Sequence, residues 1–248
     1  MIVLRYLINF SYDGSKFKGY QKQKKLRTIQ GEIEKALLSI NNKETKFTSS
    51  GRTDASVHAY NQYGHCDIDV SITEYKLKSA LNTLLPDDIY VKNVKEVDNE
   101  FHARYMVYKK EYVYKLNMGD FNPIERDYIY QFCKKLDVKN MKKAIKYFKG
   151  KHDFTSFSSN QDRKEDNVRT IYNASIKQKG KYLIFTFTGT GFLKYMVRIM
   201  VGALIMVGIG KLSYKDINNI FKKKDKSLIK ITAPGCGLYL NNVWYKKI

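Results

Sequence analysis

The stretch IQGEIEKALLSI at residues 29–40 has the apolar spacing of a helix, and it anchors the order of elements predicted for the first half of the chain. Its apolar residues recur every three or four positions, at Ile29, Ile33, Ala36, Leu37 and Ile40. This spacing places them on one face of an α-helix. Thr28 belongs to the residue types that cap helix N-termini. We therefore predict an amphipathic helix that begins after Thr28.

Strand patterns lie on both sides of this helix. Upstream, Ile2–Phe10 is typical of a strand and leads into the turn residues Asp13 and Gly14. Downstream, the patterns predict two strands, a second helix that Pro86 stops, and a further strand, at Thr45–Ser50, Tyr60–Val70, Leu77–Leu84 and Ile89–Val97. The resulting order, β-α-β-β-α-β, is that of a ferredoxin-like unit.

The second half of the chain also mixes strands and helices. The patterns predict a long strand, a helix, a hairpin around Lys179-Gly180, an apolar helix, a further helix and a last strand, at Ala103–Leu116, Val138–Phe148, Ile171–Lys177 with Tyr182–Thr188, Leu193–Val207, Ile217–Phe221 and Leu238–Tyr245. No Pro/Gly/Ser-rich linker divides the chain. The sequence therefore predicts an α+β fold with two related halves, residues 1–103 and 104–248.

The charge of the chain indicates a partner rich in phosphate. Lys and Arg number 45 against 24 Asp and Glu, which gives a formal net charge of +21 over 248 residues. A strongly basic surface attracts nucleic acid, although a lysine-rich surface without such a role would look the same. The 20 tyrosines and 13 phenylalanines among these cations suit RNA, whose bases stack on aromatic rings, while most of the rings belong to the core.

Several other classes of protein are disfavoured. The three cysteines are far apart and form no CxxC pair, which argues against a disulfide framework and fits a reducing cytosol. The four histidines lack metal-ligand spacing, so we expect no metal. The N-terminus has no signal-peptide pattern. The longest apolar run, Ile199–Ile209, is too short to span a bilayer and predicts a buried helix.

The segment SGRTDA at residues 50–55 is the first candidate for chemistry. It follows a predicted strand, contains a glycine that permits a turn, and presents Asp54 close to Arg52. A carboxylate in such a loop can act on a substrate, but it can equally cap a helix or form a turn.

Arg198 is the second candidate, because it lies with Lys194 at positions i and i+4 of the predicted apolar helix. A buried cation requires an anionic partner, and Asp54 is a candidate that the pairing would keep ionised. The alternative is that Arg198 extends to the rim of the helix and reaches water.

Tyr112 and Tyr114, in KKEYVY at residues 109–114, are the third. Residues two apart on a strand share a face. A tyrosine in a cleft can stack on a base and offer a hydroxyl for proton transfer, whereas two aromatics on one face are also typical of a core.

Nine segments in this order resemble the tRNA pseudouridine synthase A family along nearly the whole chain. Each motif is of modest specificity, but nine in the right order at fitting distances are very hard to obtain by chance. They are YDGSKFKGYQKQ (12–23), IQGEIEKAL (29–37), SGRTDASVHA (50–59), NTLLPDDIYV (82–91), FHARY (101–105), KKEYVY (109–114), HDFTSFSS (152–159), GTGFLKYMVRIMVGALIMVGIGKL (189–212) and APGCGLYL (233–240).

The resemblance implies roles for five residues. Asp54 matches the aspartate on which the family's chemistry depends, and Arg52 matches an arginine that handles the flipped nucleotide. Tyr112 matches the tyrosine that stacks on the target base. Arg198 matches the arginine that pairs with the catalytic aspartate, and Leu238 matches an apolar residue that lines the pocket.

The resemblance also implies a fold and a substrate. The family pairs two ferredoxin-like (RRM-like) halves around a largely antiparallel central sheet, flanked by helices and with a basic cleft. Its members are homodimers that isomerise uridine to pseudouridine at positions 38–40 in the anticodon stem-loop of tRNA. They need no metal or small-molecule cofactor, and we expect a cytoplasmic enzyme.

Two departures from the family pattern leave alternatives open. Ser56 stands where the family usually has glycine, and Tyr20 where it usually has tryptophan. If position 56 requires a positive φ, serine there costs about 1 kcal/mol. A paralogue that modifies ribosomal RNA and a non-catalytic RNA-binding protein are the competing interpretations, and a basic RNA-binding domain outside the family is a more distant one.

Overall fold

The computed structural model describes residues 3–159, 166–224 and 227–246, and the chain forms two compact units. The first unit combines Met1–Tyr108 with Leu240–Ile248, and the second is Lys109–Tyr239. Both mix helices with mainly antiparallel strands, so the predicted α+β class is confirmed. The end of the chain thus returns to the first unit rather than remaining with the second.

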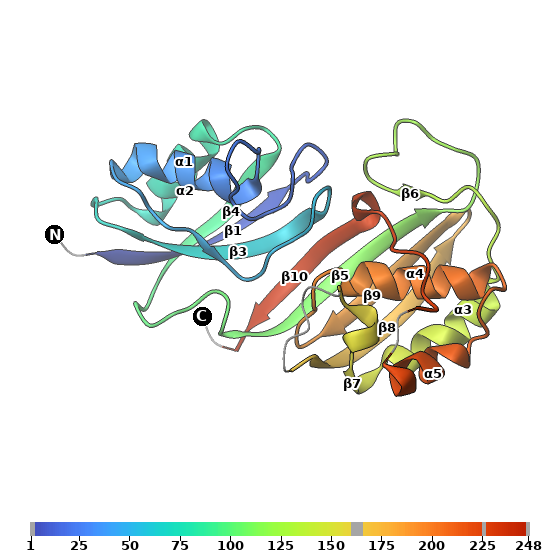
Figure 1. Cartoon of the computed structure of the whole chain (residues 1–248). Coiled ribbons are helices and arrows are strands. Elements are labelled where there is room, and N and C mark those ends of the chain that lie inside the picture. The colour runs from blue at the N-terminus through green and yellow to red at the C-terminus, as the bar shows by residue number, and fades with distance from the viewer. Residues whose placement is uncertain (1–2, 160–165, 225–226, 247–248) are drawn as a thin grey trace. The chain divides into compact units, whose positions relative to one another are not determined.

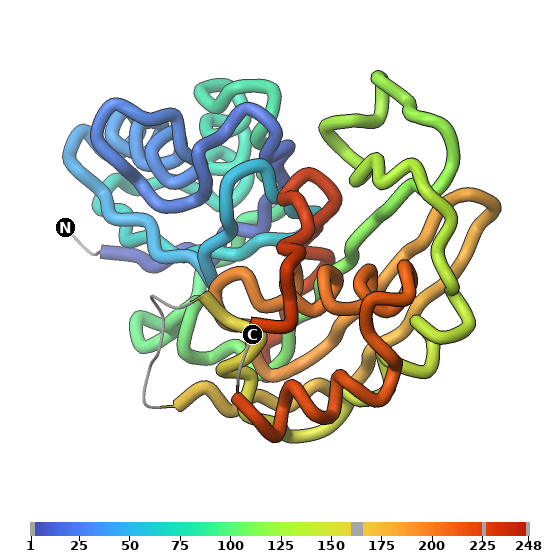
Figure 2. The backbone as a smooth tube through the Cα atoms, turned by 45° about the vertical axis from the view of Figure 1, so that its right-hand side comes forward, coloured from blue at the N-terminus to red at the C-terminus, as the bar shows by residue number. Residues whose placement is uncertain are grey.

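The first unit contains β1 (Leu4–Tyr12), α1 (Ile29–Asn41), β2 (Thr48–Ser49), β3 (His58–Ile68), α2 (Glu74–Leu84), β4 (Ile89–Val97) and most of β10 (Leu238–Tyr245). The strand order is β4-β1-β3-β10, and β2 also pairs with β3. The pairing of β1 with β3 and with β4 is antiparallel, with Leu7 opposite His65 and Phe10 opposite Val91. The two helices of this unit lie side by side in both views (Figures 1 and 2).

Local chemistry explains where α1 begins and what it covers. The Thr28 hydroxyl accepts a hydrogen bond from the Gly31 amide at 3.3 Å, which confirms the predicted N-cap. Four residues of the predicted stripe, Ile29, Ile33, Ala36 and Leu37, are buried, and Ile40 at its end is half-buried. At Gly64 on β3 an added Cβ would lie 2.4 Å from the Phe47 ring. Glycine at this position therefore lets the ring pack onto the strand.

The second unit contains β5 (Val107–Asn117), β6 (Tyr130–Gln131), α3 (Val138–Ala144), β7 (Gly150–Asp153), β8 (Val168–Lys179), β9 (Tyr182–Gly189), α4 (Met196–Gly208) and α5 (Asp216–Lys223), with short 3-10 turns at Ile145–Phe148, Thr155–Phe157 and Gly235–Gly237. The strand order is β5-β9-β8-β7, all antiparallel, and β6 runs parallel to β5. The predicted hairpin is present, and Gly180 at its turn has a φ of +57°.

Most predicted elements are present, with shifts at their ends. β4 and β10 have the predicted bounds. The strand predicted from Ala103 begins only at Val107, and the helix predicted from Leu193 begins only at Met196. The strand predicted from Ile2 begins at Leu4, and Ile2 itself lies outside the described residues. The short strands β6 and β7 were not predicted.

Candidate active site

The loop between β2 and β3 holds Asp54 on a backbone fixed from several sides. The Thr53 carbonyl accepts the Tyr20 amide at 3.1 Å, and the Thr53 hydroxyl lies 2.8 Å from the Tyr12 hydroxyl on β1. Two residues earlier, the Gly51 carbonyl accepts hydrogen bonds from the Ser49 hydroxyl at 3.0 Å and from a Gln62 side-chain amide at 2.9 Å. The residues leading to Asp54 are therefore tied to three separate segments of the first unit.

Asp54 itself opens a tight turn. The Val57 amide donates to the Asp54 carbonyl at 3.3 Å, and Ser56, the third residue of this turn, has a φ of +61°. A positive φ at the third position is what a type II turn requires, and glycine adopts it most readily. The condition considered for position 56 is therefore met, and Ser56 holds a conformation that glycine would hold without strain.

The turn packs closely against the segment around residues 17–19, which precedes α1. Gly19 has a φ of +100°, and a Cβ there would lie 3.5 Å from the Ala55 amide nitrogen. The Ser56 amide donates to the Phe17 carbonyl at 3.4 Å. The Asp54 side chain is half-buried, whereas the Arg52 side chain is exposed. Asp54 is thus presented from a rigid loop while Arg52 reaches into solvent.

Tyr112 and Tyr114 lie on the buried face of β5 in the second unit, as their spacing predicted. Tyr112 is 9% exposed and meets the Phe192 ring edge-on, with centroids 5.0 Å apart. Tyr114 is fully buried, and its hydroxyl donates to the Pro234 carbonyl at 2.9 Å. Burial raises the pKa of Tyr114 well above its usual value. Tyr114 is therefore a structural core residue.

Arg198 lies in the first turn of α4. Its Nε donates to the Ala233 carbonyl at 2.7 Å, the Ala233 amide donates back to the Arg198 carbonyl at 3.1 Å, and its guanidinium lies 4.7 Å from the centre of the Tyr195 ring. Tyr195 has left-handed backbone angles (φ 60°, ψ 0°) immediately before the helix. The prediction that Lys194 shares the helix with Arg198 is wrong, because this break places the exposed Lys194 outside it.

The segment that leads to Leu238 is clamped between α4 and β5. Arg198 and Tyr114 bond to adjacent carbonyls, those of Ala233 and Pro234. A Cβ on Gly202 of α4 would lie 1.8 Å from the Ile231 carbonyl oxygen, so only glycine allows the segment to approach the helix this closely. Leu238 follows at the start of β10 and is 5% exposed. The contacts of Arg198 within this unit thus help to position Leu238.

The predicted site residues are divided between the two units. Asp54 and Arg52 belong to the first, and Tyr112, Arg198 and Leu238 belong to the second. The pairing of Asp54 with Arg198 stays a prediction. The sequence did not single out Tyr12, whose hydroxyl supports Thr53, because the two residues are 41 positions apart and no local pattern joins them.

The described residues contain no group of three or more His, Cys, Asp or Glu side chains placed to hold a metal ion. None of their helices has both the length and the hydropathy of a membrane span.

Comparison with known proteins places the chain among RNA-modifying enzymes. A family model described as tRNA pseudouridine synthase matches residues 8–106 and 144–246. A "tRNA pseudouridine synthase A" of Anoxybacillus flavithermus is 46% identical over 236 residues, which cover 95% of this chain and 96% of that protein. One from Limosilactobacillus reuteri is 42% identical over 247 residues, covering 97% and 96%.

Solved structures give a much weaker likeness. The archaeal box H/ACA sRNP Nop10-Cbf5 complex matches with a TM-score of 0.37 at 12% identity. The match covers 81% of this chain and 42% of that one. A score this low carries no structural argument.

Proposed function

Because this chain belongs to the tRNA pseudouridine synthase family, we infer that it is an RNA isomerase that converts uridine to pseudouridine in tRNA. The observation that carries this inference is the family match over residues 8–106 and 144–246. The first range includes the turn with Asp54, and the second includes α4 with Arg198. The turn keeps its carboxylate on a fixed backbone despite the serine at position 56. Rigid support of this kind is what a catalytic group needs.

The chemistry requires that one base be detached and rejoined. The bond from the ribose C1′ to N1 of uracil breaks, and C1′ then bonds to C5. C5 loses its proton and N1 takes one up, so the product is an isomer of the substrate. The target base must first leave the helical stack, since the enzyme cannot reach the glycosidic bond inside it. Asp54 is proposed to act on the sugar, either by attacking C1′ or by removing a proton from C2′.

The remaining residues are proposed to bind and orient. Tyr112 would hold the detached uracil by stacking, and Leu238 would line the pocket. Arg198 would pair with Asp54 and keep it ionised at neutral pH. Arg52, exposed on the same loop as Asp54, would contact the flipped nucleotide. In the second unit, the fixed positions of Tyr112 and Arg198 support this assignment.

Finer features of the proposal come from the family resemblance. We propose that the target uridines are positions 38–40 of the anticodon stem-loop, that the enzyme is a cytoplasmic homodimer, and that its halves are ferredoxin-like with a basic cleft. The strand order β4-β1-β3, with β2 beside β3, supports the ferredoxin-like assignment for the first unit. The lysines that precede α1 would contact phosphates, at Lys16, Lys18, Lys22, Lys24 and Lys25.

Mapping the product tests the substrate and the residues together. Unmodified tRNA transcripts would be treated with the enzyme, and pseudouridine would be located by carbodiimide labelling and reverse-transcription stops. New stops at positions 38–40 with wild type, and none with Asp54→Asn, are expected. Ribosomal RNA would be treated in parallel. Stops in ribosomal RNA alone would identify a paralogue, and RNA binding without stops in either RNA would identify a non-catalytic protein.

A double-mutant cycle tests the pairing of Asp54 with Arg198. If the two groups act as a pair, Arg198→Lys should cost less stability in the Asp54→Asn background than in wild type, because the partner charge is already gone. The cycle is read on the free energy of unfolding in denaturant, which does not depend on turnover. Additive losses would show that Arg198 acts without Asp54.

A further inference from the structure

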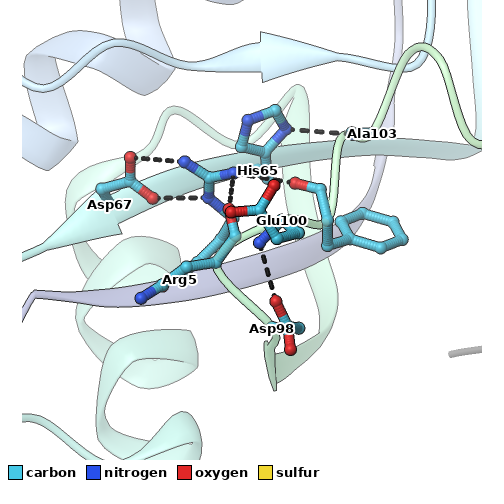
Figure 3. Close-up of polar contacts among 8 residues, drawn as sticks. Arg5, His65, Asp67, Asp98, Glu100 and Ala103 are labelled. Atoms are coloured by element: carbon cyan, nitrogen blue, oxygen red, sulfur yellow. Dashed lines mark hydrogen bonds and ion pairs between the residues drawn. The ribbon is translucent and has the colours of Figure 1, made fainter.

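The loop that joins β4 to β5, residues 98–106, is fixed by side chains from the strands of the first unit. Arg5 on β1 donates to the Asn99 carbonyl and, at 2.9 Å, to the Phe101 carbonyl. Its guanidinium is held in turn by the two carboxylate oxygens of Asp67 on β3, at 2.7 and 2.9 Å (Figure 3). A bidentate pair of this kind fixes the direction of the arginine as well as its charge.

The middle of this loop is held from two more sides. The ring of His65 on β3 points toward the loop, and its Nδ1 accepts the Ala103 amide at 3.1 Å (Figure 3). The Tyr245 hydroxyl on β10 donates to the Ala103 carbonyl at 2.7 Å. The Asp98 carboxylate accepts the Glu100 amide at 2.8 Å (Figure 3). These bonds explain why residues 103–106 are not part of the strand that their sequence predicted.

At its end the loop presents two stacked rings. His102 accepts the amides of Arg104 and Tyr105 through Nδ1, at 3.2 and 3.3 Å, which fixes its ring. The Tyr105 ring stacks on this imidazole, with centroids 4.2 Å apart and planes 26° apart. His65 supports the imidazole edge-on at 5.0 Å. Tyr105 is nevertheless 78% exposed, so one face of a well-supported aromatic ring is open to solvent.

A cation lies beside these rings. Arg104, whose amide donates to the His102 ring, directly precedes Tyr105 in the loop and is exposed. Burial lowers the pKa of His102 from its usual value, and nearby positive charges lower it further. An exposed, preorganised aromatic next to a cation is an arrangement with which proteins bind single-stranded RNA.

We propose that His102, Tyr105 and Arg104 form a second RNA-binding site, in which an unpaired base of the substrate RNA stacks on Tyr105 while Arg104 contacts a flanking phosphate. The choice of RNA as the ligand rests on the proposed function. Stacking on an aromatic ring tolerates any base, so this stacking site contributes affinity and orientation rather than sequence selection. It lies on a loop distinct from that of Asp54 and takes no part in the chemical step.

Binding measurements with an unmodified tRNA transcript test the proposal. Tyr105→Ala should weaken binding about tenfold, the range for loss of one stacked base. Tyr105→Phe should bind within about twofold of wild type, because stacking needs the ring and not the hydroxyl. Arg104→Ala should reduce the slope of log Kd against log salt by about one, as expected for one lost phosphate contact. The matched control is Tyr75→Ala on α2, where a tyrosine is 80% exposed.

Fluorescence reports the stacking directly. Trp244 is the single tryptophan of the chain, so Tyr105→Trp in a Trp244→Phe background places the only indole at this site. Addition of the transcript should quench it. An affinity in Tyr105→Ala equal to that in Tyr75→Ala, or an indole that RNA does not quench, would overturn the proposal.

Measurements of kcat and KM distinguish a failure of the stacking site from a failure of the proposed function. Tyr105→Ala should raise KM about tenfold and leave kcat at saturating RNA unchanged, because the stacking site contacts no reacting atom. A loss of kcat with unchanged KM would contradict a binding role. Failure of the wild type to modify any RNA would refute the proposed function, and the affinity and quenching measurements would still decide whether RNA binds at Tyr105.

Discussion

Replacing Ser56 by glycine should stabilise the protein, because the turn that carries Asp54 holds this residue at a φ of +61°. For an L-residue the left-handed region costs about 1–2 kcal/mol, which glycine avoids. Glycine also gives the unfolded chain more freedom, and this offsets about 0.4–1 kcal/mol of the gain. The net stabilisation is therefore roughly 0.5–1 kcal/mol.

Thermal unfolding followed by circular dichroism measures this gain. For a chain of this length the midpoint should rise by about 2 °C. Two further variants isolate the cause. Ser56→Ala keeps a Cβ at the same φ and should stay within about 0.5 kcal/mol of wild type. Ser56→Val places a β-branched side chain there and should lower the midpoint.

The comparison among these variants decides whether backbone strain is the cause. If Ser56→Gly is no more stable than Ser56→Ala, the positive φ of residue 56 stores no strain. Because the substitution leaves Asp54 and its supporting hydrogen bonds in place, Ser56→Gly should also retain turnover.

Three other predictions follow from buried groups. Tyr20→Phe should stabilise by about 1 kcal/mol in denaturant unfolding, because the hydroxyl of Tyr20 is buried and has no hydrogen-bond partner among the described residues; a loss of stability would contradict this. Burial lowers the pKa of His65 to about 4, below its unfolded value of about 6.5, so the unfolded state binds more protons and stability should fall by roughly 2 kcal/mol as pH falls from 6.5 to 4. His65→Asn, which keeps an acceptor for Ala103, should flatten that pH dependence. Gly202→Ala should cost about 1–3 kcal/mol and reduce turnover, because its methyl would meet the Ile231 carbonyl, and a wild-type midpoint would disprove the close approach.

Sequence patterns predicted most accurately those elements that are determined by residues within the element itself. The helix after Thr28 has a clear apolar stripe and a capping side chain, and both the helix and the cap are present. The strand predicted from Ala103 failed over its first four residues because hydrogen bonds from Arg5, His65 and Tyr245 fix a loop there. Those partners are distant in sequence, so no local pattern could reveal them.

The candidate site was predicted unevenly for the same reason. The turn at Asp54 was visible as a glycine-containing loop, and the resemblance to the family correctly directed attention to position 56, where φ is positive. The start of the helix at Met196 was missed, because the left-handed backbone of Tyr195 has no signature in an apolar run. The contacts of Arg198 and Tyr114 with the Ala233–Pro234 segment likewise depend on packing alone.

Tritium release measures whether Asp54 is the essential carboxylate of a pseudouridine synthase. Wild type and Asp54→Ala would be incubated with tRNA tritiated at C5 of uridine, and the tritium released into water would be counted. Release by wild type should approach the number of target uridines, and release by Asp54→Ala should not exceed background. Equal release by both proteins would contradict the role of Asp54, and release by neither would contradict the assignment of tRNA as the substrate.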